Sequence, residues 1–106
     1  MGKLIYNAQG GSFDIEDRPL SHLRVVFMNK LRRGESFMFQ HVPGDGSGSR
    51  SVWVHPSIPL VFHFYGSRPP VLNRRWVDAL MLEASGPNGL GPVAEPDADA
   101  AENQPA

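Results

Sequence analysis

The sequence contains no cysteine, which excludes disulfide bonds, thiolate zinc sites and a cysteine nucleophile. It also contains no run of about eighteen apolar residues, the length that a membrane-spanning helix requires. The first residues, Met1 to Asn7, lack the apolar stretch of a signal peptide. We therefore expect a cytoplasmic protein that has no membrane partner.

Sequence signatures of catalysis are absent too. The glycine-rich stretch at residues 43–49 lies between two expected strands, and no Gly-Lys-Ser/Thr follows it, so it does not match a phosphate-binding loop. There is no Gly-x-Ser-x-Gly nucleophile elbow, and Ser57 near His55 shows no sign of a catalytic triad. The sequence indicates neither an enzyme nor a bound cofactor.

Charge and composition divide the chain into two parts. Residues 1–86 carry all ten Lys and Arg residues and seven acidic residues, whereas residues 87–106 carry four acidic residues and no basic one. The second part is rich in Ala, Pro and Gly, and Leu90 and Val93 are its only sizeable aliphatic residues. We expect one folded domain over residues 1–86 and a disordered acidic tail over 87–106, because such a tail buries too little apolar area to offset its ordering entropy.

Hydrophobic periodicity predicts an α+β domain in the order β-β-α-β-β-β-α. Apolar residues at helical spacing follow Asp17, an expected helix cap, and a second helical stripe follows Asn73, another good cap. Alternating apolar and polar residues predict the strands. The expected strands are residues 3–6, 12–16, 35–42, 50–55 and 60–65, and the expected helices are 17–33 and 74–85.

This order predicts two layers: a mostly antiparallel sheet of about five strands with both helices on one face. In the last three strands one set of alternating side chains then faces the helices: Phe37, Phe39, Val52, Val54, Leu60, Phe62 and Phe64. The other set is left on an outward face with no third layer to cover it. That set is Met38, Gln40, Ser51, Trp53, His55, Val61, His63 and Tyr65.

The aromatic and histidine residues of the outward face, Trp53, His55, His63 and Tyr65, are candidate binding residues. Trp and Tyr are enriched in protein interfaces, and the same side chains stack on unpaired bases. A third interpretation is that Trp53 and Tyr65 are ordinary core residues beneath the helices or the tail. A protein partner or self-association, a nucleic acid and intramolecular packing all remain open at this point.

A metal site built on histidines is disfavoured. His55 and His63 sit on neighbouring expected strands, and His41 precedes the glycine-rich stretch. However, no cysteine or helical His-x-x-x-His pair accompanies them, and metal sites usually have three or four ligands with supporting hydrogen bonds.

Three arginines follow the last expected strand and are further candidates for binding. Arg74 and Arg75 occupy the first turn of a helix, where cations oppose the positive end of the helix dipole. With Arg68 they are suited to phosphate or carboxylate groups. The alternative is structural, because Arg74 is one turn from Asp78 and can pair with it.

Several stretches resemble a family of small uncharacterised actinobacterial proteins whose members are often labelled ATP-dependent DNA ligase. The resemblance covers about residues 2–92, and the stretches that carry it are residues 2–6, 31–37, 53–60 and 66–73 with Trp76. It implies a DNA-related accessory role. An ATP-dependent ligase itself needs a nucleophilic lysine within Lys-x-Asp-Gly, and neither Lys3 nor Lys30 lies in such a motif.

Overall fold

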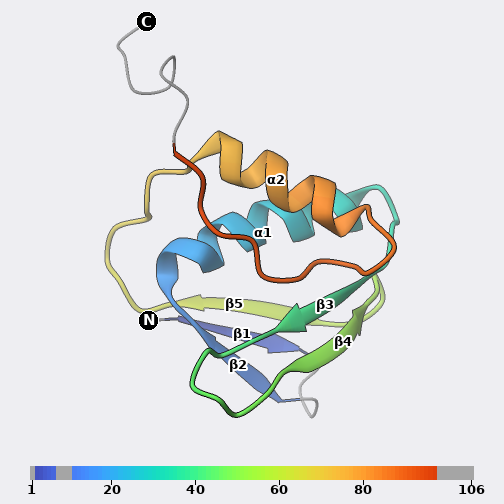
Figure 1. Cartoon of the computed structure of the whole chain (residues 1–106), viewed down its shortest axis with the longest axis horizontal. Coiled ribbons are helices and arrows are strands. Elements are labelled where there is room, and N and C mark those ends of the chain that lie inside the picture. The colour runs from blue at the N-terminus through green and yellow to red at the C-terminus, as the bar shows by residue number, and fades with distance from the viewer. Residues whose placement is uncertain (1, 7–10, 98–106) are drawn as a thin grey trace, which may run out of the picture.

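A computed structural model of the chain describes residues 2–6 and 11–97 (Figure 1). Over these residues the chain is an α+β domain with two helices and five antiparallel strands, and their order matches the prediction. The strands are β1 (Gly2–Tyr6), β2 (Ser12–Ile15), β3 (Phe37–His41), β4 (Arg50–Val54) and β5 (Leu60–Phe64), and the helices are α1 (Asp17–Arg32) and α2 (Arg74–Ala84).

The strands form two small sheets rather than the single sheet that was expected. One sheet has the order β2-β1-β5, and the other is the β3-β4 hairpin. In the first sheet Leu4 pairs with both Phe13 and Phe62, so three apolar side chains lie side by side on one face. The hydroxyl of Tyr6 donates to the carbonyl of Trp53, which links the two sheets where β4 and β5 are not paired.

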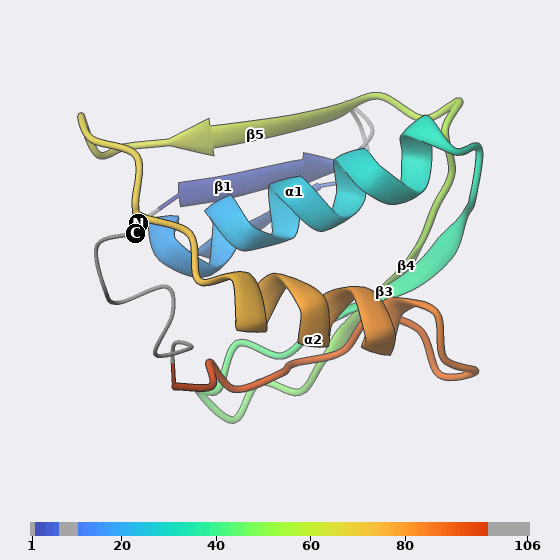
Figure 2. The same ribbon diagram turned by 90° about the horizontal axis from the view of Figure 1, so that it is seen from above.

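Helix α1 covers the inner faces of both sheets (Figures 1 and 2). Its buried side contains the apolar residues that recur at helical spacing in the sequence, among them Leu20, Leu23, Val26 and Phe27. The ring of Phe27 lies 5.0 Å from that of Phe37 and 5.5 Å from that of Phe62, so it contacts one strand of each sheet. These contacts confirm that Phe37 and Phe62 face the helices.

The start of α1 differs from the expectation. The cap residue is Glu16, whose side chain makes no capping hydrogen bond, and Asp17 is the first helical residue. The Asp17 carboxylate instead accepts a 2.8 Å hydrogen bond from the backbone N–H of Gly66. Asp17 therefore holds the chain just after β5 against the start of α1, a role that local capping rules do not predict.

Helix α2 begins where the sequence predicts. Asn73 is its cap, and the side-chain oxygen of Asn73 accepts hydrogen bonds from the backbone N–H groups of Arg75 and Trp76. The helix packs on α1 and lies on the far side of α1 from β1 and β5 (Figure 2). Its buried residues are Trp76, Leu80 and Ala84.

The segment after α2 is the largest departure from the expectation. We call residues 87–97 the C-terminal segment, and it runs along α2 beside β3 (Figures 1 and 2). Leu90 is fully buried, and its backbone makes two hydrogen bonds to β3. Its N–H donates to the carbonyl of Met38, and its own carbonyl accepts from the N–H of Gln40. The expected boundary at residue 86 is therefore wrong for residues 87–97, because one leucine in register with β3 anchors them. Residues 98–106 of the expected tail lie outside the described residues.

Candidate functional site

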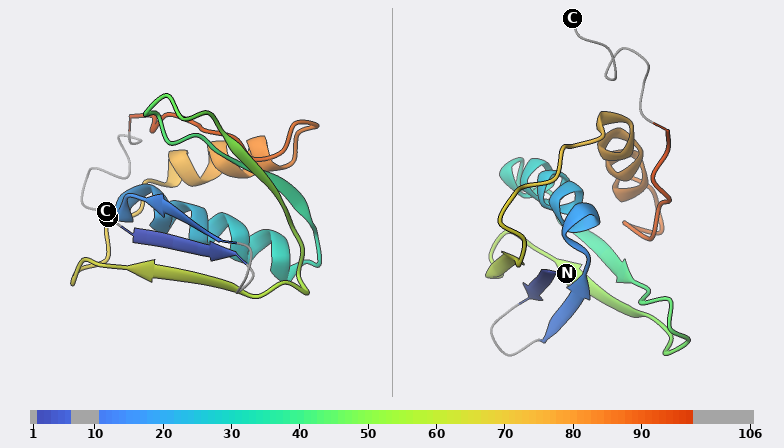
Figure 3. Two further views of the ribbon diagram at one scale, coloured as in Figure 1. Left: turned by 90° about the horizontal axis from the view of Figure 1, so that it is seen from below. Right: turned by 90° about the vertical axis from the view of Figure 1, so that its left-hand side faces the viewer.

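The candidate residues of the outward face are exposed. Trp53 and Tyr65 are 52% and 55% exposed, and His55 and His63 are exposed as well. Neither helix lies over the outer side of β1 and β5 in the view from below (Figure 3, left). The interpretation of Trp53 and Tyr65 as core residues is therefore wrong, since both present half of their surface to solvent.

The two sheets divide these residues into separate groups. His63 and Tyr65 lie together on β5 and just after it, with ring centroids 4.6 Å apart. Lys3 is the cross-strand neighbour of His63, and Ile5 is that of Val61, so the group continues onto β1. Trp53 lies on the other sheet, opposite Met38. The expected single outward face thus consists of two surfaces, one on each sheet.

His55 has a local structural role at the corner between β4 and β5. Its Nδ1 accepts a hydrogen bond from the backbone N–H of Ser57 at 3.1 Å and lies 2.8 Å from the Ser57 hydroxyl. These contacts stabilise the turn, and both of them use Nδ1 of the His55 ring. Within residues 2–6 and 11–97 no group of three or more His, Cys, Asp or Glu side chains is placed to hold a metal ion.

The three arginines are exposed and lie at the end of the molecule away from Trp53. Arg68 is in the loop that follows β5, beside Asp17, Ser21 and Arg24. Arg74 and Arg75 start α2, and one Arg75 amino group donates to the carbonyl of Asp97. In Figure 1 this loop and the start of α2 lie at the left, whereas β4 lies at the right. Tyr65 is three residues before Arg68, whereas Trp53 lies on β4 and shares a surface hollow with Arg33 instead.

Strand β5 forms one edge of its sheet. It pairs with β1 on one side, and in the described part of the chain no strand pairs with its other side. No other element lies beside that free edge in Figure 2. Its sequence, Leu-Val-Phe-His-Phe, contains no Lys, Arg, Asp, Glu or Pro, the residues that commonly protect an edge strand from pairing. Val61, on its outward side, is 50% exposed.

A cluster of polar contacts that the sequence did not indicate joins α1, α2 and the C-terminal segment. The Arg18 guanidinium donates to Glu95 through Nε at 2.9 Å and through a terminal nitrogen, and the Asn73 amide donates to the same carboxylate at 3.0 Å. These hydrogen bonds lower the pKa of Glu95 to about 2, and those from Arg18 contribute more than the one from Asn73. His22, which is fully buried, accepts a hydrogen bond from the backbone N–H of Asn73.

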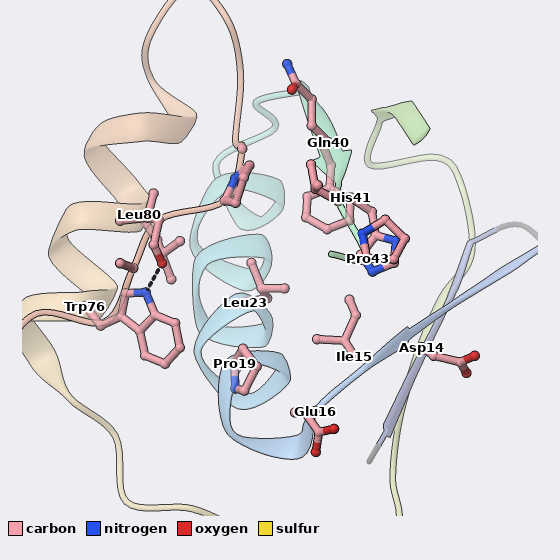
Figure 4. A pocket seen from close by; sticks show the side chains of 16 residues that line it. Asp14, Ile15, Glu16, Pro19, Leu23, Gln40, His41, Pro43, Trp76 and Leu80 are labelled. Atoms are coloured by element: carbon pink, nitrogen blue, oxygen red, sulfur yellow. Dashed lines mark hydrogen bonds between the residues drawn. The ribbon is translucent and has the colours of Figure 1, made fainter. Parts of the chain in front are cut away.

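A cleft also lies between the helices, the strand ends and the C-terminal segment (Figure 4). Its volume is about 590 Å³, and Ile15, Leu23 and Trp76 point into it from three different elements. His41 lines the cleft from the end of β3, and burial lowers the pKa of its ring. This cleft could not be inferred from the sequence, because one of its walls is residues 91–94, which were expected to be disordered.

Comparison with protein families gives one match. Residues 1–95 match the family described as "Domain of unknown function (DUF7882)". The chain belongs to this family. The DUF7882 match extends to Glu95 and so includes most of the C-terminal segment, consistent with the hydrogen bond from Trp76 of α2 to the carbonyl of Val93. No curated protein and no solved structure matches the chain. Among the described residues of this DUF7882 domain, neither helix has the length and apolar character needed to cross a membrane.

Proposed function

We propose that this DUF7882 domain is a cytoplasmic, non-enzymatic assembly module that pairs with a second copy of itself through β5. The observation that carries the proposal is the outer edge of β5, whose backbone groups pair with no other strand in the described part of the chain and lie between apolar side chains. Such an edge is a template for the addition of another strand.

Two copies related by a two-fold axis would pair β5 with β5 in antiparallel fashion. With Phe62 at the axis, Val61 of one copy stands opposite His63 of the other, and the two three-stranded sheets become one sheet of six strands. The exposed surface of Val61 and the His63–Tyr65 ring pair then lie at the junction. Backbone hydrogen bonds would supply affinity, and these outward side chains would supply specificity.

Light scattering coupled to size-exclusion chromatography over a range of protein concentrations tests this proposal. We expect a dimer that Val61→Lys and His63→Glu both weaken, because each places charge at the strand junction. Val71→Lys is the matched control. It adds the same charge away from the strand junction, because Val71 is 83% exposed in the loop after β5. Circular dichroism of each variant checks that the fold is intact.

Trp53→Ala distinguishes the two outward surfaces in the same measurement. Trp53 lies on β4, so its loss should leave a β5-mediated dimer unchanged. If Trp53→Ala dissociates the dimer and Val61→Lys does not, the partner surface is the β3-β4 sheet instead. A monomer at every concentration for the unmodified chain would rule out self-association altogether.

A second candidate function is a nucleic-acid-binding accessory role, which the resemblance to proteins labelled as DNA ligases also suggests. It is supported by the exposure of Arg68, Arg74 and Arg75 and by the position of Tyr65, three residues before Arg68. Titration with fluorescent single- and double-stranded DNA at low and moderate salt tests it. Binding through phosphates must weaken steeply as salt rises, and a lack of binding at low salt excludes this function.

A further inference from the structure

We propose that the hollow between the start of α1 and the loop after β5 binds one phosphate group, either free phosphate or the phosphate of a monoester. Arg24 of α1 and Arg68 of the loop both line this hollow. The hollow is formed within one chain, so the site does not rest on the proposed dimer. It shares Arg68 with the candidate nucleic-acid role, but it combines Arg68 with Arg24 rather than with Arg74 and Arg75.

The loop after β5 is held against α1 by Asp17 (Figure 2). The Asp17 carboxylate accepts hydrogen bonds from the backbone N–H groups of Gly66 at 2.8 Å and Tyr65 at 3.4 Å. The approach is close, because a Cβ added at Gly66 would lie 2.8 Å from the same carboxylate. This attachment brings Arg68 to the hollow that Arg24 lines from the helix.

Both arginines lack a partner in the part of the chain that the structure describes. Neither Arg24 nor Arg68 forms an ion pair or a hydrogen bond with a described residue, and both are exposed. Arg18, in contrast, pairs with Glu95. Two guanidinium groups at one hollow repel each other, and an anion between them offsets that repulsion while it accepts hydrogen bonds from both. Arginine is suited to phosphate in particular, because its planar donors match the phosphate oxygens.

The other walls of the hollow favour an anion as well. Asp17 is the one acidic residue among the described residues that line it, and its oxygens already accept from the loop backbone. Two arginines against one aspartate leave the lining with an excess of one positive charge. Phe64 and the prolines at 69–70 supply apolar walls of low dielectric, which concentrate the field of the arginines.

The size of the hollow limits what it can hold. Its volume is about 200 Å³, below the roughly 300–1,000 Å³ of sites that enclose a whole organic ligand. It therefore suits one small anionic group rather than an entire nucleotide. A phosphate monoester has close to two negative charges at neutral pH and three acceptor oxygens, which match two arginines.

NMR titration of the full chain, read at the backbone amides at about pH 7.5, tests the site. The probes are inorganic phosphate, phenyl phosphate and dimethyl phosphate, each at an ionic strength held constant with sodium chloride. We expect saturable shifts of the Ser67 and Arg68 amide signals at millimolar concentrations of the first two probes, whereas the amides of β4, at the other end of the molecule, stay unchanged (Figure 1). Dimethyl phosphate has one charge and should bind about two- to fivefold more weakly. The tighter of the two dianions identifies the source of the phosphate group as free phosphate or a monoester.

Variants of the two arginines test their roles. Arg24→Gln and Arg68→Gln should each weaken binding of phenyl phosphate by about two- to fivefold, the loss for one exposed charge pair. Arg32→Gln is the matched control: it removes the same charge at an exposed position near the end of α1, outside the lining. The proposal is overturned if neither dianion gives a saturable shift, if Arg24→Gln binds as well as the parent does, or if Arg32→Gln weakens binding equally. A single-stranded oligonucleotide without a terminal phosphate is the last probe. If it shifts the same amides at lower concentration than both dianions, the hollow serves the nucleic-acid role and the proposal also fails.

Discussion

The guanidinium of Arg18 and the carboxylate of Glu95 form a two-point ion pair across 77 positions of sequence. Arg18 is in the first turn of α1, and a third nitrogen of its side chain donates to the carbonyl of Val71 in the loop before α2. Asn73, the cap of α2, donates to the same carboxylate. The three contacts connect the start of both helices to the C-terminal segment, so this segment is part of the domain.

The first prediction concerns acid stability. Because the pKa of Glu95 is lowered to about 2 in the folded chain, ionised Glu95 stabilises the fold. That contribution is complete above the pKa of an unfolded glutamate, about 4.3, and is lost as pH falls toward 2. We expect Glu95→Gln to lower the melting temperature at pH 6 and to converge with the parent chain near pH 2.

Thermal unfolding between pH 2 and pH 6 at low salt measures this convergence. Glu83→Gln is the control, because Glu83 is an exposed carboxylate on α2 outside the Arg18 cluster. The difference between parent and control should be small throughout. A gap between parent and Glu95→Gln that stays constant over this pH range would contradict the role given to the ion pair.

The second prediction concerns the anchor of the C-terminal segment. Leu90 is fully buried, so Leu90→Ala should cost about 2–5 kcal/mol of unfolding free energy, the usual range for a core leucine. Leu82→Ala makes the same change at a position that is 77% exposed on α2, and it should stay within about 0.5 kcal/mol. Urea denaturation measures both, and equal losses would mean that the segment does not stabilise the domain.

The order of the elements was predictable because its signals are local. Alternation in β3, β4 and β5 and helical spacing in α1 arise within a few residues of one another, and Asn73 caps α2 through its own side chain. The split into two sheets was not predictable, because it depends on which distant strands pair. The C-terminal segment was missed because composition averages over a stretch, whereas Leu90 anchors it by register with β3.

The candidate site was predictable in part, again where the signal is local to one strand. Alternation correctly placed the side chains of Trp53, His63 and Tyr65 toward solvent. It did not show that Trp53 lies on a different sheet from the other two, since that depends on pairing. The cleft could not be predicted at all, because its walls come from β2, both helices and residues 91–94, and only the folded chain brings them together.

The third prediction concerns a close backbone approach at Gly89. This residue has a positive φ of 78°, and a Cβ added there would lie 2.4 Å from the carbonyl oxygen of Met38. Gly48 has a φ of 95° with nothing within 4 Å of an added Cβ. Both Ala substitutions carry the backbone strain, of order 1 kcal/mol, but only Gly89→Ala adds a steric clash.

We therefore expect Gly89→Ala to destabilise the fold by at least about 1 kcal/mol more than Gly48→Ala. The clash separates the C-terminal segment from β3, so the amide of Leu90 should also lose protection from hydrogen exchange. Gly48→Ala should leave that amide protected. Equal stability of the two variants would show that the segment can shift away from Met38 without loss.

The last prediction concerns His22, a fully buried residue of α1 whose ring packs on that of Trp76. Its Nδ1 lies 2.7 Å from the carbonyl of Arg18, and its Nε2 accepts a 2.8 Å hydrogen bond from the backbone N–H of Asn73. The ring must be neutral to do both, with its proton on Nδ1. Phenylalanine fills a similar volume but leaves the buried N–H of Asn73 without an acceptor.

His22→Phe should therefore cost about 1–3 kcal/mol, the penalty for an unsatisfied buried polar group, although the core becomes more apolar. His63→Phe is the matched control at an exposed site, measured at concentrations too low for self-association. Hydrogen exchange supplies a second readout, because the Asn73 amide should lose protection in His22→Phe alone. If His22→Phe were as stable as the parent, the ring would act only by packing on Trp76, and the start of α2 would not depend on its hydrogen bond.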